Sequence, residues 1–186
     1  MLNHGSKKNG YTLVEVLVVV SILGILSSMG VSGLHSAVVN SRIKDAAMNT
    51  AAFLERMANE SNRISKRICV KKDHDQRITA YVTADCGNLQ DAEELATLAI
   101  EAPAKFACGE SLKSDIETDF DAPDMQSGAL FVPRIGLSAA PIKGFICIQY
   151  GDGSPYGLAV KTADKNMIIP MWGHAGSDGV IHFSGL

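Results

Sequence analysis

The stretch that decides the fold runs from Thr12 to Leu34 and reads TLVEVLVVVSILGILSSMGVSGL. Fourteen of its 23 residues carry large apolar side chains, and its single charge is Glu15. At 1.5 Å per residue a helix of this length extends about 35 Å, and the hydrocarbon core of a bilayer is about 30 Å thick. The segment is therefore predicted to be a membrane-spanning helix.

The flanking charges predict how this helix is oriented. Lys7 and Lys8 precede it, and the first ten residues contain no acid. The positive-inside bias therefore places the N-terminus in the cytoplasm and everything after Leu34 outside it. An ordinary secretory signal cut near residues 31–33 and a plain signal anchor are two explanations of the segment. The plain signal anchor leaves Glu15 unexplained, because a charge inside the bilayer costs about 2.5–3.5 kcal/mol.

A third explanation uses residues 7–16, KKNGYTLVEV, as a unit. This string resembles the prepilin signature of type IV pilins and type II secretion pseudopilins. The resemblance implies that a prepilin peptidase cuts after Gly10 and methylates the new N-terminus at Tyr11. It also implies that Glu15, fifth after the cut, serves subunit assembly. The family usually has phenylalanine where this chain has Tyr11, and both side chains are aromatic.

The chemistry of such a cut explains why a charge stands in the apolar segment. Cleavage removes Lys7 and Lys8 and leaves an α-amino group close to Glu15, so two opposite charges lie near hydrocarbon. Pairing the amine of one subunit with Glu15 of its neighbour relieves both desolvation costs, and an assembled bundle of helices offers that geometry. The alternative is a glutamate that only extends to the headgroups.

The helical pattern continues beyond the membrane-spanning part. Residues 35–64 repeat apolar or small side chains at three- and four-residue steps, with charges on the other faces. The predicted buried face is Ile43, Ala46, Ala47, Thr50, Phe53, Leu54, Met57, Ser61 and Ile64. One helix from Tyr11 to Ile64 extends about 80 Å. Its amphipathic half requires a partner surface, which the rest of the chain is expected to supply.

After Ile64 the period changes from helical to two, and residues 65–186 are predicted to form a β-rich extracytoplasmic domain. Residues 67–71 and 77–83 are predicted to form a hairpin. Further strands are predicted at 128–132, 144–150, 156–161, 166–170 and 180–183. Between them, residues 87–123 are expected to be an irregular insertion with a short helix at 90–98 and an acidic turn region at 114–124. The predicted class is α+β, a long helix packed on antiparallel sheets.

A second resemblance concerns the β-rich part. A long N-terminal helix, a hairpin, an insertion and a second group of strands resemble the H-type minor pseudopilins and the FimT-like minor pilins, which implies a pilin-like fold. Residues 130–136, LFVPRIG, look like that family's aromatic-x-Pro-Arg-x-Gly turn. The family's usual Gly-Arg near the last hairpin is absent, and residues 164–166 read DKN there.

Four cysteines, Cys69, Cys86, Cys108 and Cys147, lie too far apart in sequence for a zinc knuckle. In an exported domain an even number favours disulfides, with three possible connectivities. A Cys86–Cys108 bridge is the expected one, because it closes the insertion, and it leaves Cys69 with Cys147. The alternative is that some of the four are reduced core residues.

No catalytic constellation is found in the sequence. The five histidines have no spacing that builds a triad or a metal site, and neither phosphate-binding loops nor paired catalytic carboxylates are present. The chain is therefore interpreted as a structural subunit without catalytic residues, metal or cofactor. A composition of 46% apolar and 20% charged residues fits one folded domain.

Two functions remain open. The first is a minor pseudopilin in the periplasmic pseudopilus of a type II secretion system, and the second is a minor type IV pilin acting in pilus initiation, adhesion or DNA uptake. Expected partners are the lipid bilayer of the inner membrane, other pilins or pseudopilins, the prepilin peptidase and the inner-membrane assembly platform. Removal of the leader, residues 1–10, takes the net charge from -3 to -5, which argues against nucleic acid as a partner. A basic cluster, Arg63, Lys66, Arg67, Lys71 and Lys72, is interpreted as a solvated helix end and an edge strand.

Overall fold

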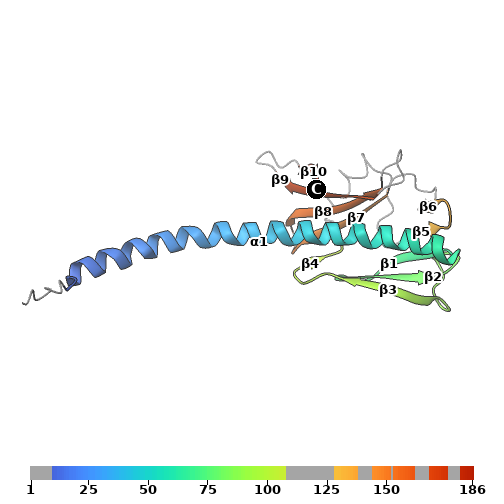
Figure 1. The fold of residues 1–186 in the computed structure, drawn as a ribbon, viewed down its shortest axis with the longest axis horizontal. Helices are drawn as coiled ribbons and strands as arrows, with labels where there is room; N and C mark the ends of the chain where they lie inside the picture. Colours follow the sequence, from blue (N-terminus) through green and yellow to red (C-terminus); the bar gives the residue numbers. More distant parts are fainter. Residues whose placement is uncertain (1–9, 108–127, 138–143, 152, 162–167, 176–180) are drawn as a thin grey trace, which may run out of the picture. The chain divides into compact units, whose positions relative to one another are not determined.

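A computed structural model describes residues 10–107, 128–137, 144–151, 153–161, 168–175 and 181–186 (Figure 1). The chain divides into two compact units, Met1–Val38 and Val39–Leu186. The elements are one helix, α1, and strands β1 to β10. The chain is α+β, with one long N-terminal helix and antiparallel sheets, and the predicted fold class is confirmed.

Helix α1 runs without interruption over Leu13–Ile64. Its end agrees with the prediction, and it begins two residues later than predicted. Within the described part of the chain it is the one helix long and apolar enough to cross a membrane. The side chains of its first turns pack against no other described part of the chain, so the start of the helix is set by local capping.

The second half of α1 buries the face that the sequence predicts. Eight of the nine predicted positions are buried and Ile64 is half-buried. The two hydroxyls on this face are satisfied locally, because Thr50 Oγ1 donates to the Ala46 carbonyl at 2.7 Å and Ser61 Oγ donates to the Lys66 carbonyl at 2.7 Å. Neither of these two helix hydroxyls is therefore left without a partner.

The first sheet has the strand order β3-β2-β1-β5-β6. Its strands are β1 (Ile68–His74), β2 (Arg77–Val82), β3 (Glu93–Ala99), β5 (Ala129–Val132) and β6 (Gly136–Leu137). The β1–β2 hairpin is antiparallel, with Cys69 opposite Tyr81, and confirms the predicted hairpin. On its other side β1 pairs with β5, which places Cys69 opposite Leu130. Strand β1 is therefore central, and β3 and β6 form the two edges.

The second sheet has the order β10-β9-β8-β7-β4. Its strands are β4 (Ala104–Lys105), β7 (Gly144–Tyr150), β8 (Gly153–Lys161), β9 (Ile168–Ala175) and β10 (Ile181–Gly185). The predicted strands of this region are present, and β8 and β9 are longer than predicted. Pairing between β8 and β9 explains the length of β9, because Met171, Trp172 and Gly173 continue the ladder past Pro170.

Residues 93–99, EELATLA, form strand β3 and not the predicted short helix. Glutamate, alanine and leucine all favour helices, but the pairing of this segment with β2 decides its conformation. Leu95, Ala96 and Leu98 pack against the core from this edge. The predicted insertion therefore contains regular structure at β3 and β4, and the acidic region 114–124 lies outside the described residues.

One hydrophobic cluster joins the second half of α1 to both sheets. It combines Ile43, Ala47, Phe53 and Met57 of the helix with Val70, Ile78 and Phe131 of the first sheet and Ile148, Ala159 and Ile168 of the second. Gly157 of β8 permits a close approach of α1 to the second sheet, because a Cβ there would lie 3.1 Å from both the Ala47 Cβ and the Ile43 carbonyl oxygen. Nearby, Lys44 Nζ lies 4.6 Å from the centre of the Trp172 ring, a cation–π contact between α1 and β9.

Candidate processing and assembly site

Thr12 caps the first turn of α1. Its side-chain oxygen accepts a hydrogen bond from the Glu15 backbone N–H at 3.2 Å, and its carbonyl accepts one from the Val16 N–H at 3.3 Å. Threonine followed three residues later by glutamate is the spacing of a capping box, and an acid in the first turn also complements the helix dipole. This spacing in the sequence indicates a helix that starts after Thr12, two residues later than the predicted start at Tyr11.

Gly10 and Tyr11 precede the helix in irregular backbone and are exposed. The Tyr11 side chain is 82% exposed, and a Cβ on Gly10 would meet no atom within 4 Å. The bond between the two residues is thus open to an enzyme that binds an extended peptide. Lys7 and Lys8 lie outside the described residues, so their predicted role as leader charges stays a prediction, as does cleavage after Gly10.

The first half of α1 presents an apolar surface that its own chain does not cover. The large apolar side chains between Leu13 and Leu26 are each at least 50% exposed. Two hydroxyls in this half of the helix bond to its own backbone, Ser21 Oγ to the Leu17 carbonyl and Ser28 Oγ to the Ile25 carbonyl, both at 2.8 Å. Their polar atoms therefore do not interrupt the apolar surface, which requires lipid or other helices around it.

Glu15 is the one charge on this surface. No ion pair joins it to any other described residue, and its backbone, not its side chain, makes the bond to Thr12. An isolated carboxylate on a helix of this kind needs a cation from elsewhere once the helix is surrounded by apolar groups. The predicted pairing with a neighbour's α-amino group fits this geometry and stays a prediction.

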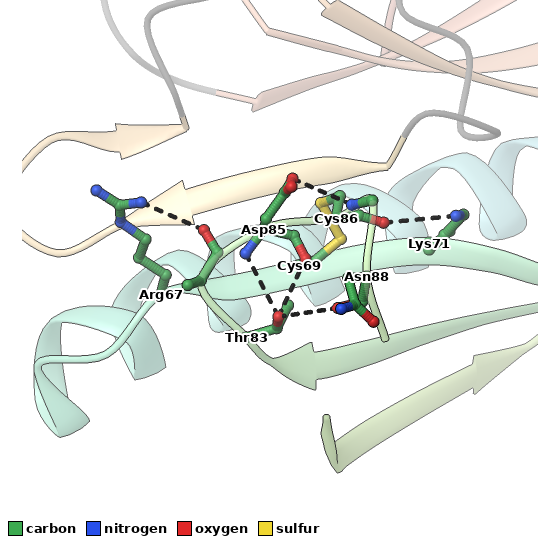
Figure 2. The surroundings of a disulfide bond; sticks show 9 residues. Arg67, Cys69, Lys71, Thr83, Asp85, Cys86 and Asn88 are labelled. Atoms are coloured by element: carbon green, nitrogen blue, oxygen red, sulfur yellow. Dashed lines mark hydrogen bonds between the residues drawn. A yellow bond between two sulfur atoms is a disulfide. The ribbon is translucent and has the colours of Figure 1, made fainter. Parts of the chain in front are cut away.

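The disulfide pairing differs from the expected one. Cys86 is bonded to Cys69, with their Cα atoms 5.5 Å apart, and not to Cys108 (Figure 2). Cys69 lies buried in the central strand β1, and the Thr83 N–H bonds the Arg67 carbonyl at 3.2 Å as β2 ends. The chain then turns back alongside β1, so Cys86 arrives next to Cys69. Sequence spacing carries no information about this return.

The expected Cys69–Cys147 pairing is also wrong, because Cys69 is bonded to Cys86. Cys147 is disulfide-bonded as well. Cys108 lies outside the described residues. The alternative of reduced core cysteines does not hold for the three cysteines that are described. Oxidised cysteines fit an exported domain.

Gly128, which leads into β5, lies directly against the Cys69–Cys86 bond. Its φ of +82° is in the left-handed region, and a Cβ there would lie 2.9 Å from both sulfur atoms. Only glycine satisfies both conditions without displacing the disulfide. A glycine before a strand is a common sequence pattern, so nothing local distinguished this one.

The basic cluster is mostly engaged in local contacts. Its interpretation as part of an edge strand is wrong, because β1, which carries Lys71 and Lys72, is the central strand of its sheet. Arg63 pairs with Glu60, Lys72 pairs with Asp75, and Arg67 and Lys71 donate to the carbonyls of Ala84 and Cys86. The bond from Arg63 holds the pKa of Glu60 below its usual value, and the bond from Lys72 does the same to the pKa of Asp75. Both carboxylates are therefore ionised at neutral pH. Lys66 has no ionic partner among the described residues.

Among the described residues, no group of three or more histidine, cysteine, aspartate or glutamate side chains could hold a metal ion. The predicted absence of catalytic residues and cofactors is not tested by this observation, and it stays a prediction.

The comparison with protein families gives one match. The family model described as the prokaryotic N-terminal methylation motif matches residues 5–31. Neither a curated protein nor a solved structure matches the chain. The match covers Gly10, Tyr11 and Glu15 and the first turns of the exposed apolar helix, and together these indicate membrane anchoring. The N-terminal segment thus carries a prokaryotic methylation motif, which supports a type IV pilin-like protein that a prepilin peptidase processes and that assembles with other pilins.

Proposed function

We propose that the chain is a minor pseudopilin, a non-enzymatic structural subunit of the periplasmic pseudopilus of a type II secretion system. The observation that carries the proposal is the helix α1, whose first half begins two residues after Tyr11 and exposes an uncovered apolar surface. Before assembly this surface lies in the inner membrane, with the N-terminus in the cytoplasm and the second unit in the periplasm. After assembly it packs against the helices of neighbouring subunits.

The proposed sequence of events follows from the charges. The peptidase cuts the bond after Gly10, which removes Lys7 and Lys8 and with them the charges that favour a cytoplasmic N-terminus. The new α-amino group at Tyr11 then needs an anion, and Glu15 of a neighbouring subunit supplies it. Because this pairing satisfies two buried charges at once, it favours the assembled state over the isolated subunit in the membrane. An inner-membrane platform extracts the subunits into the filament.

The processing step is tested by mass spectrometry of the protein isolated from membranes. The native chain is expected to lose ten residues and to begin with a methylated Tyr11. Gly10→Leu is expected to leave the uncut precursor in the membrane, while the matched substitution Gly5→Leu leaves cleavage intact. A mature N-terminus near Leu34 would instead identify an ordinary secretory signal and contradict the proposal.

The choice between secretion and piliation is tested by deleting the gene and restoring it. Deletion is expected to trap folded exoproteins in the periplasm without affecting surface pili. Crosslinking in membranes, followed by purification, is expected to recover other pseudopilins and the assembly platform. Loss of pili with normal secretion would identify the protein as a minor type IV pilin.

A further inference from the structure

The second unit has a basic end where the last turn of α1 meets the turn between β5 and β6. We use the name basic end for the exposed residues Arg63, Lys66, Arg67 and Arg134. The Arg134 N–H donates to Asn62 Oδ1 at 2.6 Å, and Ser61 Oγ contacts the Phe131 carbonyl at 3.4 Å. These bonds join segments about seventy positions apart in the sequence. Glu60 neutralises only Arg63, so three positive charges are left in excess.

Backbone conformation singles out the same place. Ser65 and Arg134 are the two non-glycine residues with positive φ in the described parts of the chain, at 53° and 68°. Ser65 occupies the left-handed position that commonly ends a helix. Arg134 follows Pro133 as the third residue of a turn that the Ile135 N–H closes on the Val132 carbonyl at 3.2 Å, a position that takes a positive φ. Its own N–H bonds Asn62, which ties this turn to the end of α1. The result is a turn that presents Arg134 next to Ile135.

Ile135 is 58% exposed, an unusual degree for an isoleucine in a folded domain. An apolar side chain bordered by arginine and lysine is typical of protein-binding surfaces, where arginine is enriched and an apolar residue serves as the anchor. A polyanion such as nucleic acid would meet the same cations but gains nothing from Ile135. Its approach is also opposed by the negative charge of the whole chain.

The other side of the same sheet carries the complementary charge. Asp91, Glu93 and Glu94 lie exposed at the start of the edge strand β3, and we call them the acidic edge. No basic residue occurs between positions 84 and 101. Glu93 lies opposite Val82, and Val82 lies opposite Ile68, so the acidic edge and Arg67 lie at one end of the sheet. Two strand spacings, about 10 Å, separate the backbones of the two surfaces. Among the described residues no ion pair joins Arg67 to the acidic edge.

We propose that the basic end of one copy docks side by side on the acidic edge of a second copy. The inference rests on the proposed function, because it describes a contact between neighbouring subunits of a filament. In the proposed filament the helices of all subunits insert in the same direction, so neighbouring copies are not related by a two-fold axis and each contact leaves one basic end and one acidic edge unused. A contact of this heterologous kind propagates into a helical filament rather than closing a symmetric dimer. Ile135 lies at the centre of the interface, and the charges set its register.

The test measures crosslinking between two copies of the chain, which are distinguished by their isotopic mass. Full-length chains made with light and with heavy nitrogen are mixed in detergent and treated with a carbodiimide, which links an amine to a carboxylate only where they touch. Lys66 is expected to be linked to residues 91–94 of a chain of the other mass. The yield is expected to fall as salt is raised from 0.05 to about 0.5 M, because exposed charges are screened.

Charge reversal then identifies the contact while Lys66 stays as the reporter. Arg134→Glu and Glu94→Arg are each expected to lower the mixed-mass crosslink at least tenfold, and their combination is expected to restore it. Arg42→Glu, an equal charge change on an exposed part of α1, is expected to leave it unchanged. Protease resistance and an intact Cys69–Cys86 bond establish that each variant is folded. If Arg134→Glu does not fold, Arg134→Gln replaces it and is expected to lower the mixed-mass crosslink by an intermediate amount.

The inference is overturned if Lys66 is linked only within one chain or only to another protein, if the combined reversal does not restore the crosslink, or if Arg42→Glu is equally damaging. These failures differ from a failure of the proposed function. Cleavage after Gly10 and assembly dependent on Glu15 would persist if only the lateral contact were wrong, and both would be lost if the chain were not a pilin-like subunit.

Discussion

The side-chain oxygen of Thr12 accepts a hydrogen bond from the Glu15 backbone N–H at 3.2 Å. The residue that caps α1 therefore uses the backbone of Glu15 and leaves its carboxylate available. Helix capping by Thr12 and the proposed role of Glu15 in assembly can for this reason be separated by substitution.

Glu15→Leu is expected to enter the membrane at least as well as the native chain and to be cleaved normally. Removing the charge eliminates an insertion cost of about 2.5–3.5 kcal/mol. Assembly is expected to fail, because deleting one member of a desolvated ion pair typically costs about 3–5 kcal/mol. Crosslinking of subunits into filaments measures the loss.

Thr12→Val is the matched control, since it removes the cap and keeps the carboxylate. It is expected to fray the start of α1 at a cost of about 1 kcal/mol and still to assemble. Filaments formed by Glu15→Leu in native amounts would show that the carboxylate only extends to the headgroups.

Gly128→Ala is expected to destabilise the second unit strongly. The new Cβ combines a left-handed φ with a contact of 2.9 Å to both sulfur atoms of the Cys69–Cys86 bond. Gly151→Ala separates the two effects, because Gly151 also has a positive φ of 63° but no atom within 4 Å of the added Cβ. The control is expected to lose about 1–2 kcal/mol of unfolding free energy, and Gly128→Ala measurably more. Equal losses of unfolding free energy in the two variants, measured by thermal or denaturant unfolding, would mean that the disulfide moves to accommodate the added Cβ without destabilising the fold.

Gly157→Val is expected to push α1 away from β8. A Cβ at this position already lies 3.1 Å from the Ile43 carbonyl oxygen, which belongs to the helix backbone and cannot rotate aside. Overpacking of this kind typically costs about 1–3 kcal/mol. Gly185→Val, with open space around its Cβ, is the control for the strand environment. Denaturant unfolding compares the two, and a Gly157→Val protein as stable as the control would contradict the close packing.

The pH dependence of the Glu60–Arg63 pair has a definite sign. Because Arg63 lowers the pKa of Glu60 below its usual value of 4.5, the pair stabilises the folded state above that value. Its contribution disappears as the pH falls through the lowered pKa. Arg63→Gln is expected to return the carboxyl titration, followed by NMR, toward 4.5 and to leave the titration of Asp75 beside Lys72 unchanged. A Glu60 titration insensitive to Arg63→Gln would rule out the assigned cause.

Local periodicity accounts for what the sequence predicts well. The buried face of α1 follows from the 3.6-residue repeat, and the β1–β2 hairpin follows from alternation around a polar turn. Strand β3 was missed because Glu93 to Ala99 are mostly helix-forming residues, and only pairing with β2 makes them a strand. Long-range features left no local signal, including the Cys69–Cys86 bond and the contact between Asn62 and Arg134. At the N-terminus the methylation motif is recognisable in sequence, whereas the roles of Gly10, Tyr11 and Glu15 stay predictions.

The Cys69–Cys86 bond has a mechanical consequence for the chain in its proposed role as a filament subunit. Tension that enters the second unit from α1 reaches Cys69 one residue into β1 and then has a covalent path to Cys86. The segment between them, residues 70–85, contains all of β2 and is thereby removed from the load path. Pulled straight, that segment would add roughly 60 Å to the chain. The bond therefore keeps the hairpin from being drawn out under force and gives the subunit a fixed length.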